Sequence, residues 1–306
     1  MPRLTILLAL VSLLAQAAPA IQFDSNRAWE HLRQLVSIGP RPSGTAAIGQ
    51  ARTYIKDQLA AVGLKAVEQT WIDDTPIGKL PMANLIATIG GTGKDRIIIA
   101  GHYDTKRIRE FRFVGANDGG SSAAFLIELA RVLKARKNPL TIDLVFFDGE
   151  EAIVDWQGND NTYGSRHYVE VAKRDKSLGS LKAMILVDMI GDRDLHIRRD
   201  TASTGWLTEM IWDAARRQKL DAAFVPSNTG IGGDDHMPFL AVGVPSVDII
   251  DLEASYGGGR DSLPSEPWHT AQDTLDAVSA RSLQVVGDVV LAALPQIEAR
   301  LSRPLR

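Results

Sequence analysis

Apolar residues recur along this chain in two patterns, as short continuous runs and as helical stripes. The runs predict buried strands at residues 96–100, 141–147, 183–187 and 246–250. Two further strands, with polar residues between the apolar ones, are predicted at 65–72 and 84–89. Apolar positions three and four residues apart predict helices at 26–36, 45–61, 120–135, 163–173, 203–218 and 279–294.

Strands that alternate with helices in this way are typical of an α/β fold. We therefore expect three layers: an open, mostly parallel mixed sheet with helices on both of its faces. No linker, repeat or low-complexity segment interrupts the chain, so a single domain is expected over residues 21–306. Residues 107–116 and 252–267 are expected to be loops, and the second of these contains three consecutive glycines.

The first twenty residues differ from the rest of the chain. Arg3 is followed by an apolar core at residues 4–14 and by the small residues Ala18, Pro19 and Ala20. This pattern is typical of a secretory signal peptide, and its core is too short to span a bilayer stably. We expect residues 1–20 to be removed; an uncleaved N-terminal anchor is the alternative. The mature protein is then expected to be secreted or periplasmic, without stable membrane association.

The overall composition narrows the function. The chain of 306 residues is 45% hydrophobic, as in globular proteins, and has a formal net charge of −3. Its charges are spread without acidic or basic blocks, which argues against nucleic-acid binding and against a polybasic membrane anchor. There is no cysteine, so any metal site must be built from His, Asp and Glu.

Two adjacent glutamates, Glu150 and Glu151, directly follow the apolar run at 144–147 and the Asp148-Gly149 pair. Carboxylates side by side at the end of a buried strand repel each other and lose hydration. A solvated turn is one interpretation of this pair. A metal ion that binds one carboxylate and leaves the other as a base accounts for the pair better.

Further residues of metal-binding type also follow predicted strands: His102, Asp118, Asp188 and His269. Loops beyond the carboxyl ends of strands in an open α/β sheet form one crevice, so these side chains are expected to converge there. Asp104 lies on the same strand face as His102 and could accept its second ring N–H. Three His, Asp and Glu ligands with an open fourth position suit zinc as a Lewis acid, with Glu150 as a general base.

Five segments resemble a known family. They are Gly101-His102-Tyr103-Asp104, Gly115-Ala116-Asn117-Asp118, Phe147-Asp148-Gly149-Glu150-Glu151, Asp188-Met189-Ile190-Gly191 and Trp268-His269-Thr270. Together they resemble the zinc exopeptidase fold, which is shared by secreted two-zinc aminopeptidases and by glutaminyl cyclases (glutaminyl-peptide cyclotransferases). The match is dense from residue 101 to residue 273 and weak before it.

The resemblance implies two alternative uses of nearly the same residues. An aminopeptidase would bind two zinc ions bridged by Asp118, with Glu150 as the base and with five ligands: His102, Asp118, Glu151, Asp188 and His269. A cyclase would bind one catalytic zinc through Asp118, Glu151 and His269. Glu150 would then shuttle protons, and Asp188 would pair with Asp234. The ligands alone therefore do not separate the two activities.

Residues outside the ligand set favour the cyclase. Trp156 and Trp268 are expected to wall the pocket, because flat aromatic side chains can enclose a small amide and exclude water; core packing is the alternative for both. Segments 163–167, 234–240 and 243–245 also resemble cyclases. The chain departs from the cyclase pattern at Gly232 and Gly233, which replace a bulkier pair, and at Asp248, where cyclases have a histidine.

We therefore expect a zinc-dependent glutaminyl cyclase that converts the N-terminal glutamine of peptides or proteins to pyroglutamate and releases ammonia. The expected catalytic residues are Glu150, Asp188 and Asp234. His102, Asp104 and His236 are candidates for binding a second metal or supporting the first ligands, and His236 is expected to donate to the Asp188–Asp234 pair or to cap a helix. The alternatives are a two-zinc aminopeptidase and an inactive binding module of the same fold. We expect a monomer whose partners are peptide N-termini.

Overall fold

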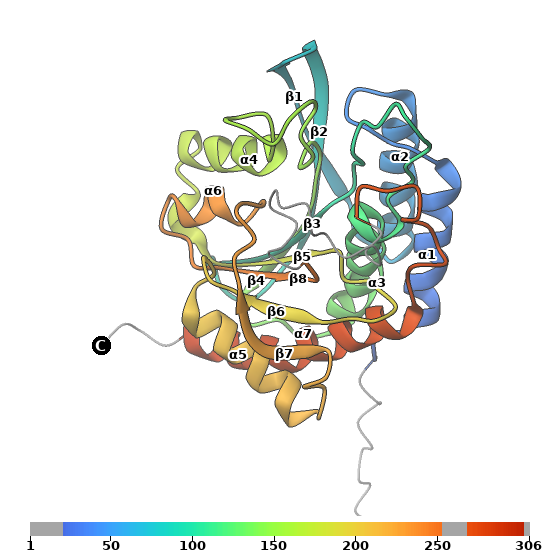
Figure 1. Ribbon diagram of the computed structural model, residues 1–306. Helices are drawn as coiled ribbons and strands as arrows, with labels where there is room; N and C mark the ends of the chain where they lie inside the picture. Colours follow the sequence, from blue (N-terminus) through green and yellow to red (C-terminus); the bar gives the residue numbers. More distant parts are fainter. Residues whose placement is uncertain (1–20, 253–267, 303–306) are drawn as a thin grey trace, which may run out of the picture.

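The computed structural model describes residues 21–252 and 268–302. The predicted signal peptide, residues 1–20, and the predicted loop at 252–267, apart from Leu252, lie outside the described residues. Within them, a six-stranded sheet lies between two layers of helices, which confirms the predicted α/β fold (Figure 1). Among the helices of the described ranges, none is long and apolar enough to cross a membrane.

The sheet has the strand order β1-β2-β4-β3-β5-β8. In this order, the strands span Ala66–Thr75, Gly78–Ile89, Thr141–Phe147, Arg96–His102, Leu181–Asp188 and Ser246–Ile250. β3 pairs in parallel with both β4 and β5, and β5 pairs in parallel with β8. β2 is antiparallel to β4 and to β1. The sheet is therefore mixed and mostly parallel, as predicted.

Alternate residues of β3 enter two different cores. Ile97 and Ile99 belong to a cluster that includes buried residues from α1 (Ser25–Ile38), α2 (Ala46–Ala61), α3 (Ser122–Ala135), α5 (Gly205–Arg217) and α7 (Ala280–Leu301). Ile98 and Ala100 belong to a second cluster with α4 (Tyr163–Arg174) and α6 (Met237–Leu240). Because both faces of the strand are covered, its apolar run is continuous and does not alternate with polar residues.

The first hairpin is longer than the sequence predicts. β1 and β2 pair from Ala66↔Ala87 to Thr75↔Gly78, and the pair ends at a turn in which Gly78 has a φ of 109°. β4 pairs only with residues 85–89 of β2, so the outer part of β2 tolerates Pro81, which has no backbone N–H to donate. In Figure 1 this end of the hairpin projects beyond the helices.

Several short elements are absent from the prediction, including two strands and one helix. β6 (Ile197–Asp200) and β7 (Phe224–Thr229) form a separate parallel pair, and α6 is a single helical turn. Elements of this length do not contain enough residues to show a clear hydrophobic period. They nevertheless matter, because residues 230–236, which lead from β7 to α6, reach the site described below.

The last helix was predicted to end at Leu294, directly before Pro295, a residue that cannot donate a helical hydrogen bond. The structure instead continues α7 to Leu301 through this proline. Beyond it, Ile297 is fully buried in the core and Glu298 forms an ion pair with Arg136. Tertiary contacts therefore hold the final turns in place despite the missing hydrogen bond.

A buried histidine in α1 leads to a prediction about the effect of pH on stability. His31 is 8% exposed, its Nδ1 lies 2.9 Å from Tyr54 Oη, and burial lowers its pKa to about 4. The unfolded chain binds this proton near pH 6.5, whereas the folded protein binds it only near pH 4, so stability is lost as the pH falls between these values. We expect wild type to lose about 2 kcal/mol of unfolding free energy at pH 5 relative to pH 7 through this residue.

The His31→Gln variant removes the titrating group and keeps a polar partner for Tyr54. Urea unfolding of wild type and variant at both pH values measures the difference. Equal pH-dependent losses in the two proteins would contradict this account of His31.

Candidate active site

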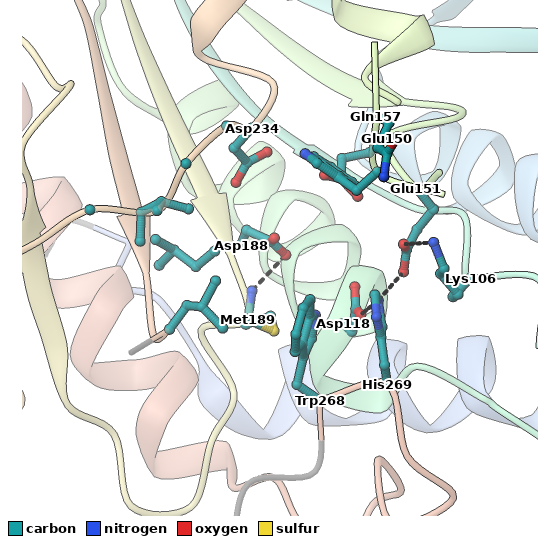
Figure 2. Close-up of a pocket in the computed structure, with 17 residues that line it drawn as sticks. Lys106, Asp118, Glu150, Glu151, Gln157, Asp188, Met189, Asp234, Trp268 and His269 are labelled. Atoms are coloured by element: carbon teal, nitrogen blue, oxygen red, sulfur yellow. Dashed lines mark hydrogen bonds and ion pairs between the residues drawn. The ribbon is translucent and has the colours of Figure 1, made fainter. Parts of the chain in front are cut away.

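Neighbouring strands of the sheet end in polar side chains that meet at one edge. β3 ends at His102, β5 ends at Asp188, and the turn after β4 carries Glu150 and Glu151. Because these three strands are parallel, their carboxyl ends lie at the same edge of the sheet. Figure 2 shows the pocket that is lined, among other residues, by Asp118, Glu150, Glu151, Asp188 and His269.

Asp118, Glu151 and His269 form one group that can hold a metal ion. His269 Nε2 lies 3.1 Å from Glu151 Oε1 and 3.3 Å from Asp118 Oδ2. Tetrahedral ligands about 2.0–2.1 Å from a zinc ion are separated from one another by about 3.3 Å, so these distances fit a shared ion. Asp118 Oδ2 and Glu151 Oε2 are buried and make no hydrogen bond to other described residues, which leaves them free to bind one.

A second group contains His102, Asp118 and Asp188. His102 Nε2 lies 3.1 Å from both Asp118 Oδ1 and Asp188 Oδ1. Asp104 Oδ1 lies 3.3 Å from His102 Nδ1, which orients the ring so that Nε2 faces the other two residues. Asp118 belongs to both groups and offers one oxygen to each, so the second group also has the composition and spacing of a metal site.

The charge balance of the site favours a bound cation. Burial alone would lower the pKa of His269, but the carboxylates of Glu151 and Asp118 raise it to about 10. Burial would raise the pKa of Asp118, but His102 and His269 hold it well below its usual range. The pKa of Glu150 is raised well above its usual range, first by burial and then by neighbouring carboxylates, against the opposing effect of His102. A divalent ion would supply the positive charge that this cluster of acids lacks.

Asp118 is presented by a kinked π-type turn, Ala116–Ser121, directly before α3. Asp118 has φ −81° and ψ 106°, and Gly119 adopts the left-handed conformation with a φ of 75°. Asp273 fixes this turn, because its two carboxylate oxygens accept the backbone N–H groups of Asn117 at 2.7 Å and of Asp118 at 3.1 Å. His269 has a positive φ, of 51°, so this metal-binding side chain comes from a left-handed backbone conformation that is uncommon for residues other than glycine.

Gly119 cannot accept a side chain without disturbing the site. A Cβ atom there would lie 2.3 Å from Asp104 O and 2.9 Å from His102 Cε1, in a conformation that disfavours any L-residue. We expect Gly119→Ala to lower the free energy of unfolding by about 2–4 kcal/mol and to reduce the metal content, because the displaced turn carries Asp118. Urea unfolding and elemental analysis measure the two effects.

Gly49→Ala in α2 is the matched control, because a Cβ atom there meets nothing within 4 Å. In a helix, alanine is favoured over glycine by up to about 1 kcal/mol, so this variant should be as stable as wild type or slightly more stable. Similar stability and metal content in the two variants would contradict the account of the turn.

A cavity of about 740 Å³ adjoins the metal-binding residues. Trp156 and Trp268 both line it, and the Trp268 ring stacks on His269 with the ring centroids 4.2 Å apart. Trp156 is 41% exposed, so its indole is not part of the core. In Figure 2, Asp188 and Asp234 lie on the side of the pocket away from Glu151 and Lys106.

The pocket lies within the segment that a family comparison identifies. The sequence signature of peptidase family M28 matches residues 84–294, which is more than half of the chain and includes every metal-binding candidate described above. The chain belongs to peptidase family M28.

Named relatives of this M28 protein include glutaminyl cyclases. A glutaminyl-peptide cyclotransferase of Drosophila melanogaster is 28% identical over 275 residues, which are 81% of this chain and 75% of that protein. The crystal structure of an Acidobacteriales bacterium glutaminyl cyclase is 40% identical, with a TM-score of 0.85, and covers 94% of this chain and 100% of that one. The glutaminyl cyclase of Porphyromonas gingivalis is 28% identical, with a TM-score of 0.80 over 90% of this chain and 98% of that one.

Solved exopeptidases share the fold at lower identity. The structure of a leucine aminopeptidase precursor from Bacteroides thetaiotaomicron is 24% identical, with a TM-score of 0.78, and covers 90% of this chain and 98% of that one. At this identity the likeness supports the fold alone. The family and the named relatives together identify this M28 protein as an enzyme.

Two buried residues support the site without having been predicted. Asp273, which fixes the Asp118 turn, lies four residues after His269, at the end of the stretch 101–273 over which the resemblance is dense. Arg41 is fully buried and donates to the carbonyl oxygens of Tyr103 at 2.7 Å, Val114 at 2.6 Å and Gly115 at 2.9 Å. Nothing local in the sequence marks this arginine as buried, because its three acceptors are remote backbone atoms.

The surroundings of His236 also differ from the prediction. Its side chain makes no capping hydrogen bond to α6, so the capping role is wrong. Its Nε2 lies 3.3 Å from Asp200 Oδ2 and its Nδ1 lies 3.6 Å from Asp248 Oδ2. Neither acid was predicted as its partner: Asp200 lies in a short strand that was missed, and the pairing of Asp248 with His236 depends on how separate elements meet.

Proposed function

We propose that this M28 protein is a glutaminyl cyclase, which converts the N-terminal glutamine of a peptide to pyroglutamate and releases ammonia. The observation that carries the proposal is the Glu150 carboxylate, which lines the pocket beside the Asp118–Glu151–His269 group without belonging to it, in a chain 40% identical to a glutaminyl cyclase over 94% of its length. A pocket lined by two tryptophans adds support, because a cyclase must keep water from competing with ring closure.

Asp118, Glu151 and His269 would hold one zinc ion and leave an open position towards the pocket. The ion would supply a Lewis acid that polarises the γ-amide carbonyl of the substrate glutamine. Lys106 supports this group, since its Nζ donates to Ala152 O at 3.0 Å and lies 3.9 Å from Glu151 Oε2. The lysine thereby fixes the segment that carries Glu151 and offsets part of its charge.

Glu150 would carry the proton during the reaction. The substrate α-amine nitrogen forms a bond with the γ-carbonyl carbon, and the bond from that carbon to the amide nitrogen breaks. The proton lost by the amine passes to the departing nitrogen, so a single group that first accepts and then donates is sufficient. Glu150 is buried, and its raised pKa suits it to hold this proton between the two steps.

Asp188 and Asp234 would hold the substrate amide in place. Both line the pocket, and the pKa of Asp234 is raised well above its usual range by burial and by the charges of Asp188 and Asp235. A carboxyl pair that shares a proton can accept an amide N–H and still donate one hydrogen bond. Because the attacking amine belongs to the substrate itself, correct positioning supplies much of the rate enhancement.

Mass spectrometry of a Gln-initiated peptide tests the proposal. We expect the product to be lighter by one ammonia, with every residue retained. The same peptide with an acetylated α-amine should not react, because its nitrogen cannot attack the γ-carbonyl. Loss of the whole N-terminal residue, or no reaction with the free peptide, would contradict the proposed activity.

A two-zinc aminopeptidase is the second candidate, and one observation favours it. His102, Asp118 and Asp188 form a complete second group, with His102 Nε2 3.1 Å from an oxygen of each acid. This candidate predicts two ions per chain and release of free amino acids from a Leu-initiated peptide. The cyclase predicts one ion and no cleavage of that peptide, so elemental analysis and one further peptide distinguish the two.

We also propose that the enzyme is exported as a monomer after residues 1–20 are removed, which leaves a single domain at 21–306. The basic residue, apolar core and small residues of this segment support the proposal. The mature N-terminus, read from the exported protein by mass spectrometry, should lie near residue 21. An unprocessed N-terminus at residue 1 would contradict it.

A further inference from the structure

Asp234 belongs to a group of buried polar side chains that includes none of the three residues proposed to bind zinc. We call Asp200, Asp234, His236 and Asp248 the acid cluster; each of them is less than 5% exposed. They come from three places: the end of β6, the loop before α6 and the middle of β8. Asp234 alone among them lines the pocket, so the other three can affect the substrate only through it.

The hydrogen bonds of the acid cluster leave one acid unexplained. Asp200 Oδ2 accepts the backbone N–H and the hydroxyl of Ser203 at 2.8 Å and 2.9 Å, and it lies 3.3 Å from His236 Nε2. By contrast, neither oxygen of Asp248 accepts a hydrogen bond from a described residue, although Asp248 is fully buried. Burying such a carboxylate without hydrogen-bond donors is strongly unfavourable, so Asp248 requires a counter-ion or a proton.

The neighbours of Asp248 indicate whether its carboxylate is neutralised by a counter-ion or by a proton. Among the described residues, His236 is the basic group that forms an ion pair with Asp248, and its Nδ1 lies 3.6 Å from Asp248 Oδ2, beyond hydrogen-bond distance. On its other side, a carboxylate oxygen of Asp248 lies within 4.8 Å of one of Asp234, and a ring nitrogen of His236 completes a group in which all three atoms are this close. Two carboxyl groups in contact repel each other when both are ionised, whereas one proton between them makes a strong hydrogen bond.

We propose that Asp248 carries this proton and donates a hydrogen bond to Asp234, which makes Asp248 a positioning residue for the acid that faces the substrate. One oxygen of the Asp234 carboxylate accepts this hydrogen bond, and the other oxygen stays directed into the pocket. His236 lies between Asp200 and Asp248, with its Nε2 3.3 Å from Asp200 Oδ2, and it stabilises the part of the acid cluster that does not line the pocket. The proposal rests on the proposed function, since it assigns to Asp248 a role in positioning the substrate amide.

The charges around Asp248 agree with a held proton. Burial, followed by the charges of Asp234, Asp188 and Asp200, raises the pKa of Asp248 well above its usual range. The titratable groups that face the Asp234–Asp248 pair come from several elements and are His102, Glu150, Asp188, Asp200, Asp235 and His236. Carboxylates outnumber imidazoles in this set, so a proton on Asp248 relieves repulsion that the two histidines do not cancel.

Two substitutions separate hydrogen-bond donation from simple packing. Asp248→Asn keeps the shape of the side chain and replaces the proposed O–H donor by an amide N–H. Asp248→Ala removes the donor. We expect the asparagine variant to keep kcat within threefold of wild type, and the alanine variant to lose at least tenfold in kcat with KM changed by less than threefold.

Ser246→Ala is the control for damage to β8, because Ser246 is buried in the same strand and its hydroxyl donates only to Val244 O within the described chain. It should leave kcat unchanged. Equal losses in kcat for the asparagine and alanine variants would overturn the proposal, and so would wild-type kcat in the alanine variant.

Infrared difference spectroscopy tests the proton directly and does not depend on turnover. The spectrum of wild type minus Asp248→Asn at neutral pH should contain the carbonyl stretch of a protonated carboxyl group. Absence of that band would overturn the proposal, and so would a metal content one ion lower in Asp248→Asn than in wild type, which would mean that a cation occupies the acid cluster. If wild type forms no pyroglutamate, the proposed function fails, whereas the infrared band still decides where the proton lies.

Discussion

Replacing Glu150 by glutamine is expected to reduce ammonia release from a Gln-initiated peptide by about 10³-fold, within the range that general acid–base groups contribute. Glutamine has nearly the same shape as glutamate, but it cannot accept the proton of the attacking amine. The substrate should still bind, because the tryptophan walls and the metal-binding residues are unchanged, so the loss should appear in kcat. Steady-state kinetics with a coupled ammonia assay measures it.

Metal content is the control for Glu150→Gln. Glu150 lies beside the Asp118–Glu151–His269 group but is not a member of it, so the variant should bind as much metal as wild type. Turnover within tenfold of wild type would contradict the role of Glu150 in both the cyclase and the aminopeptidase. A variant that loses its metal together with its activity would instead identify Glu150 as a ligand.

Replacing His269 by alanine is expected to remove one metal ion per chain and to lower ammonia release by at least about 10³-fold. His269 supplies the nitrogen ligand of the group, and without it two adjacent carboxylates remain. A ligand that binds only the folded state raises its melting temperature, so added zinc should stabilise metal-depleted wild type and have little effect on this variant. Elemental analysis and thermal unfolding with and without zinc measure the two effects.

His196→Ala is the matched control for the loss of a histidine. The His196 side chain is 45% exposed, and its contact with Asp194 at 3.9 Å belongs to the surface. This variant should keep its metal, its response to zinc and its activity. Unchanged metal content in His269→Ala would contradict the proposed metal site, whatever the activity of that variant.

The positions of several site residues could be predicted because they follow strongly apolar strands. The runs that end at His102 and Asp188 are buried on both faces, and such strands are visible in the sequence as continuous Val, Ile and Leu. Since parallel strands present the same ends at one edge, the convergence of these side chains follows from the order of the elements. The same reasoning places Glu150 and Glu151 beyond the end of β4.

The turn that presents Asp118 could not be predicted in the same way. Its conformation depends on Asp273, which is 155 residues away along the chain, and on the close approach of Gly119 to His102 and Asp104. The sequence predicted a helix from residue 120 and did not indicate the kinked turn before it. Contacts of this kind leave no local period in the sequence.

Asp248 shows a different limit of sequence analysis. It is the one charged residue in the strand Ser246–Ile250, and the resemblance marked it only as a departure from the cyclase pattern. Its importance depends on His236, Asp234 and Asp200, which come from elements that are short or irregular. Only the three-dimensional structure shows that these four side chains share one buried volume.

The central claim is that Asp118, Glu151 and His269 bind one divalent ion beside a carboxylate that does not bind it. Anomalous diffraction at the zinc absorption edge, from crystals grown with zinc, tests this claim most directly. The account predicts a peak about 2.0–2.2 Å from one ligand atom of each of the three residues, with Glu150 outside this distance. An anomalous map with no peak within bonding distance of these three side chains would contradict it.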